Sequence, residues 1–293
     1  SLMLPRGTFS LRGELMHAFV SYRVATEGPE GNGLSDLLAE KIRALSMDST
    51  QQLQIPRHGW GLWPEGAKQA VPFRKEEAKV FLDRDCLQDG QSWLAGFVKA
   101  LVASMVVVPL LSWTEDDKGS VGEMSRIGVG GFDRVDNVLL ELIIAVALRD
   151  EPRSAVQAVL PVLIGATRPP TLSLTTRGFA PFPFYKLAGL SDAPSRATNA
   201  LAAAILRQLG VREEKVQDVL RRSVKQVVNL VLQNQGVHAV EWGDVDVLVA
   251  ECGTRVLKTV LQEMRRLRSD PSYFEQGTPM GSEVLEWLQE TNL

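Results

Sequence analysis

The sequence predicts an α/β fold built on a doubly wound parallel sheet, because strand-length apolar runs alternate with helix-length segments. The clearest run is SMVVVPLLS at 104–112, which is apolar throughout, as strands buried on both faces of a parallel sheet are. Two other runs, at 15–22 and 157–165, are also short and apolar. The alternation favours the flavodoxin-like type of sheet, in which ligands bind beyond the carboxyl ends of the strands.

The first elements follow from local patterning. LMHAFVSY at 15–22 reads as a buried strand, and a polar, Gly-rich stretch follows it at 26–33. Next comes an amphipathic helix with one apolar face, formed by Leu34, Leu37, Leu38, Ile42 and Leu45. Residues 47–77 contain three prolines, several glycines, Trp60 and Trp63, without periodicity. We expect a long loop or insertion there.

The central part continues the alternation. AKVFL at 78–82 is a second strand, and the polar loop 83–93 enters a helix that runs to about Ala103. The strand at 104–112 follows, and then a charged, Gly-rich segment at 114–135 that we expect to be a mobile loop. A helix is predicted over 137–148, and Asp136 has the residue type favoured at an N-cap.

The last third changes character. After the strand at 157–165, residues 166–195 are rich in Pro and Thr, and a helix at 196–209 closes the first domain. We expect a tail at 1–14, a domain at 15–209 and a C-terminal α-helical extension at 210–293. Its expected helices span 213–235, about 244–268 and 282–290. They form either a hairpin packed on the sheet domain or a small interaction module.

Composition narrows the class of protein. The formal net charge of −3 argues against nucleic acid as the main partner. Two cysteines, Cys86 and Cys252, give no disulfide framework and favour a reducing, cytoplasmic setting. The histidines are scattered and Cys86 has no second Cys or His at metal-ligand spacing, so we expect no metal site.

Targeting and phosphate-loop patterns are absent from this sequence. The first 16 residues lack the apolar core of a signal peptide, and no apolar run reaches the length of a membrane-spanning helix. We therefore expect no membrane segment in this chain. The glycines at 119–131 do not follow the Walker pattern, so they do not predict a phosphate loop of that kind.

One residue stands out against its surroundings. DNVLLELIIAVAL at 136–148 is apolar on every side except for Glu141. A lone carboxylate in such a helix is costly unless something pairs with it or uses it, which makes Glu141 a candidate functional residue. The structural alternative is an ion pair with a nearby cation such as Arg23.

Four segments, in order and at suitable spacing, together resemble a TIR domain over roughly residues 15–208. HAFVSYR at 17–23 is similar to the first TIR strand, which ends in Ser-Tyr-Arg. VFLDRDCLQDGQSW at 80–93 is similar to the second strand with the long BB loop. SMVVVPLLS at 104–112 resembles the central strand, and the segment at 136–148 repeats the pattern of an Asp, a Glu five residues on and an Ala four residues later.

The resemblance implies an activity. Enzymatic TIR domains cleave NAD⁺ and keep their catalytic Glu where this chain has Glu141. Breaking the bond between nicotinamide and ribose gives an oxocarbenium-like transition state with a neutral leaving group. One carboxylate is therefore sufficient for catalysis, and no general acid is needed. The resemblance also implies NAD-binding roles for Tyr22, Arg23, Asp83, Arg84, Ser112, Trp113 and Asn137.

The sequence departs from the family pattern at two places. Asn137 stands where some NAD-cleaving relatives have Trp, which leaves open whether the product is ADP-ribose or a cyclic form. Trp93 or Trp113 is a candidate for the missing stacking surface. The insertion at 47–77 is also longer than usual, and we expect it to cover or regulate the site.

The resemblance also implies partners. In active TIR assemblies the BB loop of one copy completes the site of the next, so we expect self-association through Asp83 to Trp93 and binding to other TIR domains. Two functions compete: an NAD⁺ glycohydrolase and a non-catalytic adaptor in innate-immune signal transduction. A different nucleotide enzyme on the same fold needs further carboxylates or a phosphate loop, and the sequence offers neither convincingly. Glu141 is the residue that discriminates between the first two.

Overall fold

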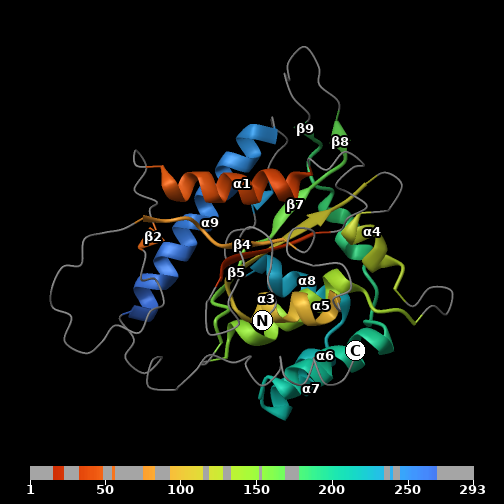
Figure 1. The fold of residues 1–293 in the computed structure, drawn as a ribbon. Coiled ribbons are helices and arrows are strands. Elements are labelled where there is room, and N and C mark those ends of the chain that lie inside the picture. Colours follow the sequence, from red (N-terminus) through yellow and green to blue (C-terminus); the bar gives the residue numbers. More distant parts are fainter. Residues whose placement is uncertain are drawn as a thin grey trace, which may run out of the picture.

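Parallel strands form the centre of the molecule, with helices on both faces (Figure 1). The computed structural model describes the following residues: 16–22, 33–48, 55–56, 75–82, 93–114, 119–127, 133–151, 154–168, 178–233, 238–239 and 245–268. The central sheet contains six strands in this part of the chain: β1 (Met16–Ser21), β4 (Val80–Phe81), β5 (Ser104–Ser112), β6 (Ala158–Val159), β7 (Val162–Ile164) and β10 (His238–Ala239).

The strand order is β10-β7-β5-β1-β4, with β6 also paired to β5, and the pairings described in this sheet are all parallel. If β6 and β7 are counted as one interrupted strand, the order along the chain is 2-1-3-4-5. That is the order of flavodoxin-like sheets. The predicted α/β class with a parallel sheet is therefore confirmed, and the strand order is compatible with the flavodoxin-like type.

The fourth strand position is interrupted by proline. A single strand was expected over 157–165, which is wrong, because β6 and β7 are separate segments. Both pair with β5 in the same register, so Pro109 and Pro161 fall opposite each other in the gap between them. Neither proline has a backbone N–H to donate, so the ladder loses its hydrogen bonds there and resumes beyond.

Two layers of helices cover the sheet (Figure 1). On one face lie α1 (Leu34–Met47) and α9 (Val245–Arg268), which pack on each other and on β1 and β5. On the other face α5 (Asn137–Arg149) is the central helix, surrounded by α3 (Trp93–Val102), α6 (Arg196–Gln208), α7 (Glu213–Leu220) and α8 (Val224–Gln233). Residues 138–148 of α5 are all buried, which explains a helix that is apolar on nearly every side.

Shorter elements complete the described part of the chain. The helix α4 (Ser120–Ser125) follows β5, and a 3-10 turn, η3 (Phe184–Gly189), precedes α6. Two small antiparallel pairs join β2 (Ile55–Pro56) to β3 (Lys75–Glu76) and β8 (Thr167–Arg168) to β9 (Gly178–Phe179). The prediction of a loop over all of 114–135 is thus wrong at α4, while residues 115–118 and 128–132 lie outside the described residues.

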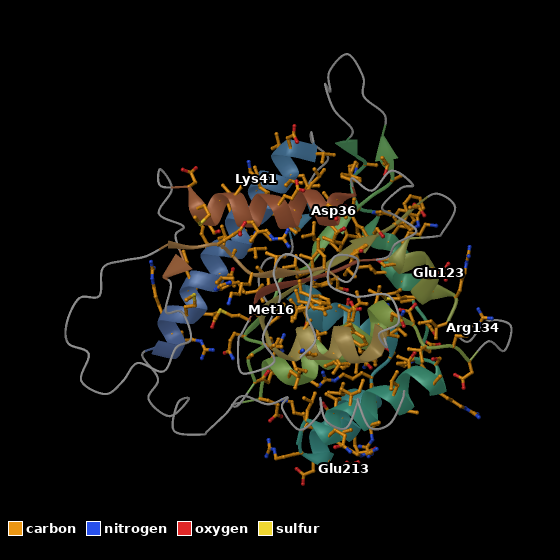
Figure 2. All side chains as sticks on the ribbon, in the orientation of Figure 1. Met16, Asp36, Lys41, Glu123, Arg134 and Glu213 are labelled. Atoms are coloured by element: carbon orange, nitrogen blue, oxygen red, sulfur yellow. The ribbon has the colours of Figure 1, made fainter. Side chains whose placement is uncertain are left out.

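Each face of the sheet has its own hydrophobic core. Alternation along β1 divides its side chains between them: Phe19 packs on the α5 side, whereas Val20 and Tyr22 pack on the α1 side. Phe19 stacks on Phe81 of the neighbouring strand, with ring centroids 5.1 Å apart. Side chains fill the space between the sheet and both helical layers (Figure 2).

The C-terminal part of the chain contributes to these same cores. Leu209 and Val211, on either side of the expected division at residue 210, belong to the α5-side core, and α9 supplies much of the α1-side core. The strand β10, which the sequence did not predict, is an edge strand of the sheet. The division into a domain and an extension stays a prediction, and the helix expected at 282–290 lies outside the described residues, as does most of 47–77.

The single helix expected over 213–235 is wrong, because the chain breaks between α7 and α8. Ser223 and Gln226 form a reciprocal pair of hydrogen bonds at this break. The Gln226 backbone N–H donates to Ser223 Oγ at 3.1 Å, and the Ser223 N–H donates to Gln226 Oε1 at 2.8 Å. This is a capping box that starts a new helix, and the Ser-x-x-Gln spacing in the sequence was its signal.

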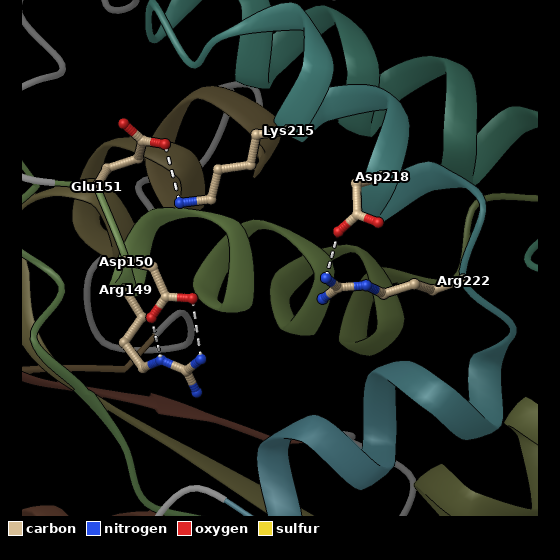
Figure 3. Close-up of polar contacts among 6 residues, drawn as sticks. All are labelled: Arg149, Asp150, Glu151, Lys215, Asp218 and Arg222. Atoms are coloured by element: carbon tan, nitrogen blue, oxygen red, sulfur yellow. Dashed lines mark hydrogen bonds and ion pairs between the residues drawn. The ribbon is translucent and has the colours of Figure 1, made fainter.

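Charged residues connect the carboxyl end of α5 to α7 (Figure 3). Arg149 donates two hydrogen bonds to Asp150, which hold the pKa of that carboxyl below its usual value. The buried Glu151 forms an ion pair with Lys215, whose Nζ lies 2.9 Å from Glu151 Oε1. These contacts lie away from the carboxyl ends of the strands and give Glu151 a structural role.

Stability should fall with acid because of His17. His17 is buried in β1, and its Nδ1 accepts a 2.8 Å hydrogen bond from the Lys79 backbone N–H. Burial, with a smaller contribution from Lys79, lowers the pKa of His17 to about 4. Between pH 6.5 and 4 the unfolded chain therefore binds more protons than the folded chain, so stability is present above this window and is lost as the pH falls through it.

We expect the parent chain to lose about 3 kcal/mol from this residue between pH 7 and 4. In His17→Asn the amide oxygen can replace the Nδ1 acceptor, but it does not titrate, so this part of the loss should disappear. Urea unfolding at several pH values measures both chains. An equal loss of stability in parent and variant would contradict the assignment.

Candidate functional site

Glu141 lies at the carboxyl end of the central strands. It is only 7% exposed, and Ser21 Oγ donates a hydrogen bond to its Oε2. Ser21 is the last residue of β1 and pairs with Pro109, three residues before the end of β5, so the carboxylate stands beside the carboxyl end of β1. This edge is where ligands bind in open parallel sheets.

The pleat of β1 explains why Ser21 meets the helix. Successive side chains of a strand point to opposite faces, and Phe19, two residues earlier, belongs to the α5-side core. Ser21 therefore points to the same face as α5. Sequence reasoning did not single out Ser21, although its place two residues after a buried Phe in a strand motif was the available signal.

The start of α5 is fixed by two sets of hydrogen bonds. Asp136 caps the helix as predicted, since its Oδ1 accepts from the Leu139 backbone N–H at 2.8 Å. The beginning of α6 then holds the preceding segment: Thr198 Oγ1 accepts from the Asp136 N–H at 3.0 Å, and Ser195 Oγ donates to the Arg134 carbonyl at 2.7 Å. These contacts set the height of α5 along the sheet, and hence the position of Glu141.

Ser112 and Ser120 join the end of β5 to α4. The Ser112 N–H donates to Ser120 Oγ at 2.8 Å, and the Ser120 N–H donates to Ser112 Oγ at 3.2 Å. Both residues are buried. The predicted binding residue Ser112 thus has its hydrogen bonds directed to the neighbouring turn, and its described contacts shape the rim of the sheet.

Trp113 follows directly and packs against the α5-side core. Its backbone N–H donates to the Ile164 carbonyl at 2.9 Å, which continues the pairing of β5 with β7. Its indole Nε1 is buried and has no hydrogen-bond partner among the residues that the structure describes. Lys186 of η3 places its ammonium group 5.1 Å from the centroid of the indole ring. Sequence reasoning missed Lys186, because nothing local relates η3 to β5.

Of the other predicted site residues, Asn137 lies near Glu141, Tyr22 lies on the other face of the sheet, and the rest lie outside the described residues. Asn137 lies one helical turn before Glu141, on the same side of α5, and is exposed. The Tyr22 side chain belongs to the α1-side core, so the structure does not bring it together with Glu141. The predicted residues Arg23, Asp83 and Arg84 lie outside the described residues, as does the expected BB loop up to residue 92; α3 begins at Trp93.

This arrangement limits the chemistry that Glu141 can support. A buried carboxylate of this kind can accept hydrogen bonds, stabilise a positive charge that develops beside it or take a proton. Within the described ranges, no group of three or more His, Cys, Asp or Glu side chains is placed to hold a metal ion. None of the described helices has the length and apolar character needed to span a membrane.

Comparisons with known proteins leave the family open: no protein-family model, no curated protein and no solved structure matches this chain significantly.

Gly119 is required by close packing at this rim. A Cβ at this position would lie 2.5 Å from the Ser112 carbonyl oxygen and 2.9 Å from Trp113 Cα, and neither backbone atom can move aside easily. We expect Gly119→Ala to lower the free energy of unfolding by about 1–3 kcal/mol. Urea denaturation measures this loss.

Gly189→Ala is the matched control, because a Cβ there meets no atom within 4 Å. Its effect should stay within about 0.5 kcal/mol. If both substitutions were equally mild, the rim would be less tightly packed than this geometry requires.

Proposed function

We propose that this chain is a TIR-domain NAD⁺ glycohydrolase that is activated by self-association. It would cleave the nicotinamide–ribose bond of NAD⁺ to give nicotinamide and ADP-ribose or a cyclic ADP-ribose. The observation that supports this proposal best is the position of Glu141, a buried carboxylate at the carboxyl edge of a parallel sheet, held by the Ser21 hydroxyl.

The reaction needs what this environment can supply. The transition state carries positive charge on the ribose ring, and a carboxylate beside it lowers the energy of that charge. The apolar side chains of α5 around Glu141 reduce screening by water, which strengthens the interaction. The leaving nicotinamide is neutral, so it needs no proton from a general acid. A second carboxylate to supply that proton is therefore not required.

Ser21 would act as a positioning residue. A hydroxyl that donates to a carboxylate restricts its rotamer, and a carboxylate can accept more than one hydrogen bond, including from ribose hydroxyls. Asn137, one turn nearer the amino end of α5, lies on the same side of the helix and would line the approach to Glu141.

We expect Glu141→Gln to reduce nicotinamide release from NAD⁺ by at least about 100-fold. The amide keeps the shape of the side chain and can still accept from Ser21, but it has no negative charge to stabilise the transition state. The assay uses the full chain at high concentration with a crowding agent, because activity should depend on self-association.

Glu151→Gln is the control for this experiment. Glu151 is 8% exposed, nearly as buried as Glu141, and it follows the opposite end of α5, where it pairs with Lys215. This variant should retain activity wherever circular dichroism shows that it is folded. Equal activity of the parent chain and Glu141→Gln would refute the catalytic assignment.

Ser21→Ala should lower kcat/KM for NAD⁺ roughly 10- to 100-fold, which corresponds to the 1.5–3 kcal/mol of a hydrogen bond to a charged group. Ser104→Ala is its matched control, since Ser104 is equally buried at the opposite end of β5 and donates to the Ala100 carbonyl at 2.7 Å. If both variants lost activity in proportion to their loss of stability, Ser21 would have no specific role in positioning Glu141.

The second candidate is a non-catalytic TIR adaptor that acts by assembly with other TIR domains. The same Ser21–Glu141 hydrogen bond favours it, because that bond partly compensates the burial of the carboxylate without any substrate. If the chain is an adaptor, light scattering should detect assembly of the parent chain, and the parent chain should release no nicotinamide. Glu141→Gln should assemble as the parent chain does.

A further inference from the structure

A lysine is held between aromatic rings next to the end of β5. Lys186 Nζ lies 5.1 Å from the ring centroid of Trp113 and 5.9 Å from that of Tyr185. Tyr185 is 73% exposed and its neighbour Phe184 is 48% exposed, whereas large apolar side chains elsewhere in the described residues are mostly buried. This group of residues lies at the surface and is accessible to a ligand.

Lys186 has no ion-pair partner among the described residues. Within the described part of the chain, its ammonium group contacts the two rings and no carboxylate. Cation–π contacts orient an ammonium group, but they do not cancel its charge. The buried indole N–H of Trp113 also has no acceptor in the described part of the chain.

The register of β1 against β5 gives the distance along the sheet between Glu141 and the pair formed by Trp113 and Lys186. Ser21, which holds Glu141, pairs with Pro109 of β5, and Trp113 lies four residues further along the same strand direction. At ~3.3 Å per residue the separation along the sheet is about 13 Å. Trp113 packs on the same core as α5, so both features lie on one face of the sheet. The separation is too long for contact with the ribose at Glu141, and it is on the scale of the remainder of a dinucleotide.

We infer that Lys186, oriented by Trp113, binds a phosphate group of the substrate, so that the substrate class is a phosphate-bearing dinucleotide and not a nicotinamide riboside. This inference rests on the proposed function and extends the same site. An ammonium group binds phosphate as a point charge, and contact with the Trp113 ring orients that charge. Lys186 belongs to η3, which begins 35 residues after the end of α5 in the sequence.

The test measures equilibrium binding by dialysis, with the full-length Glu141→Gln chain as the background, because it should bind NAD⁺ without consuming it. Adding Lys186→Gln should weaken NAD⁺ binding about tenfold, while Lys186→Arg, which keeps the charge, should stay within about threefold of the background. Nicotinamide riboside has no phosphate, and its binding should not change. Excess inorganic phosphate should compete with NAD⁺ in the background chain and much less in Lys186→Gln.

Lys225→Gln is the control, because Lys225 is an exposed residue of α8 and its substitution changes the net charge equally. Equal weakening of NAD⁺ and riboside binding in Lys186→Gln would show a structural role and overturn the inference. Unchanged NAD⁺ binding in Lys186→Gln, or failure of the background chain to bind NAD⁺, would overturn it as well.

The same data separate this inference from the proposed function. If NAD⁺ binds in a Lys186-dependent manner but the parent chain releases no nicotinamide, the proposed hydrolysis fails and the phosphate site stands. If the parent chain releases nicotinamide and Lys186→Gln binds NAD⁺ normally, the hydrolysis stands and the phosphate site fails.

Discussion

The hydrogen bond from Ser21 to Glu141 connects the two parts of the molecule on which a site at this edge depends. It links the end of a central strand to a helix whose other side chains are almost all apolar and buried. A buried carboxylate is unfavourable without such a donor, so the bond fixes which face of α5 meets β1. The cap at Asp136 and the contacts from the start of α6 then fix the height of the helix along the sheet.

Much of the fold was predictable because it is encoded locally. The strand at 104–112 and the helices that begin near residues 34, 137, 196 and 245 follow from apolar periodicity and from recognisable caps. The errors have local causes that are visible afterwards: Pro161 interrupts a strand that is apolar throughout, and Ser223 with Gln226 ends one helix and starts another. The two residues of β10 are too few to carry any periodicity.

The site was less predictable because it depends on the pleat and on long-range packing. Adjacent residues of a strand face opposite ways, so Ser21 and Tyr22 cannot both meet α5, and the structure brings Ser21 to it. Lys186 reaches Trp113 from a segment that lies more than seventy residues later in the chain. No sequence pattern relates the two, and only the packing of η3 beside the end of β5 makes them neighbours.

The two buried glutamates near α5, Glu141 and Glu151, differ in the groups that contact them. Glu151 is paired with Lys215 within the protein, so its burial is compensated by a full opposite charge. Glu141 accepts a hydrogen bond from the neutral hydroxyl of Ser21, which orients the carboxylate. The ribose–nicotinamide bond of NAD⁺ develops positive charge as it breaks, and a carboxylate at the carboxyl edge of the sheet would stabilise that charge. A positive Lys186 further along the same face suits the phosphates of the same molecule. The two charges are therefore complementary to opposite parts of one dinucleotide, which is a stronger reason to consider NAD⁺ than either residue provides alone.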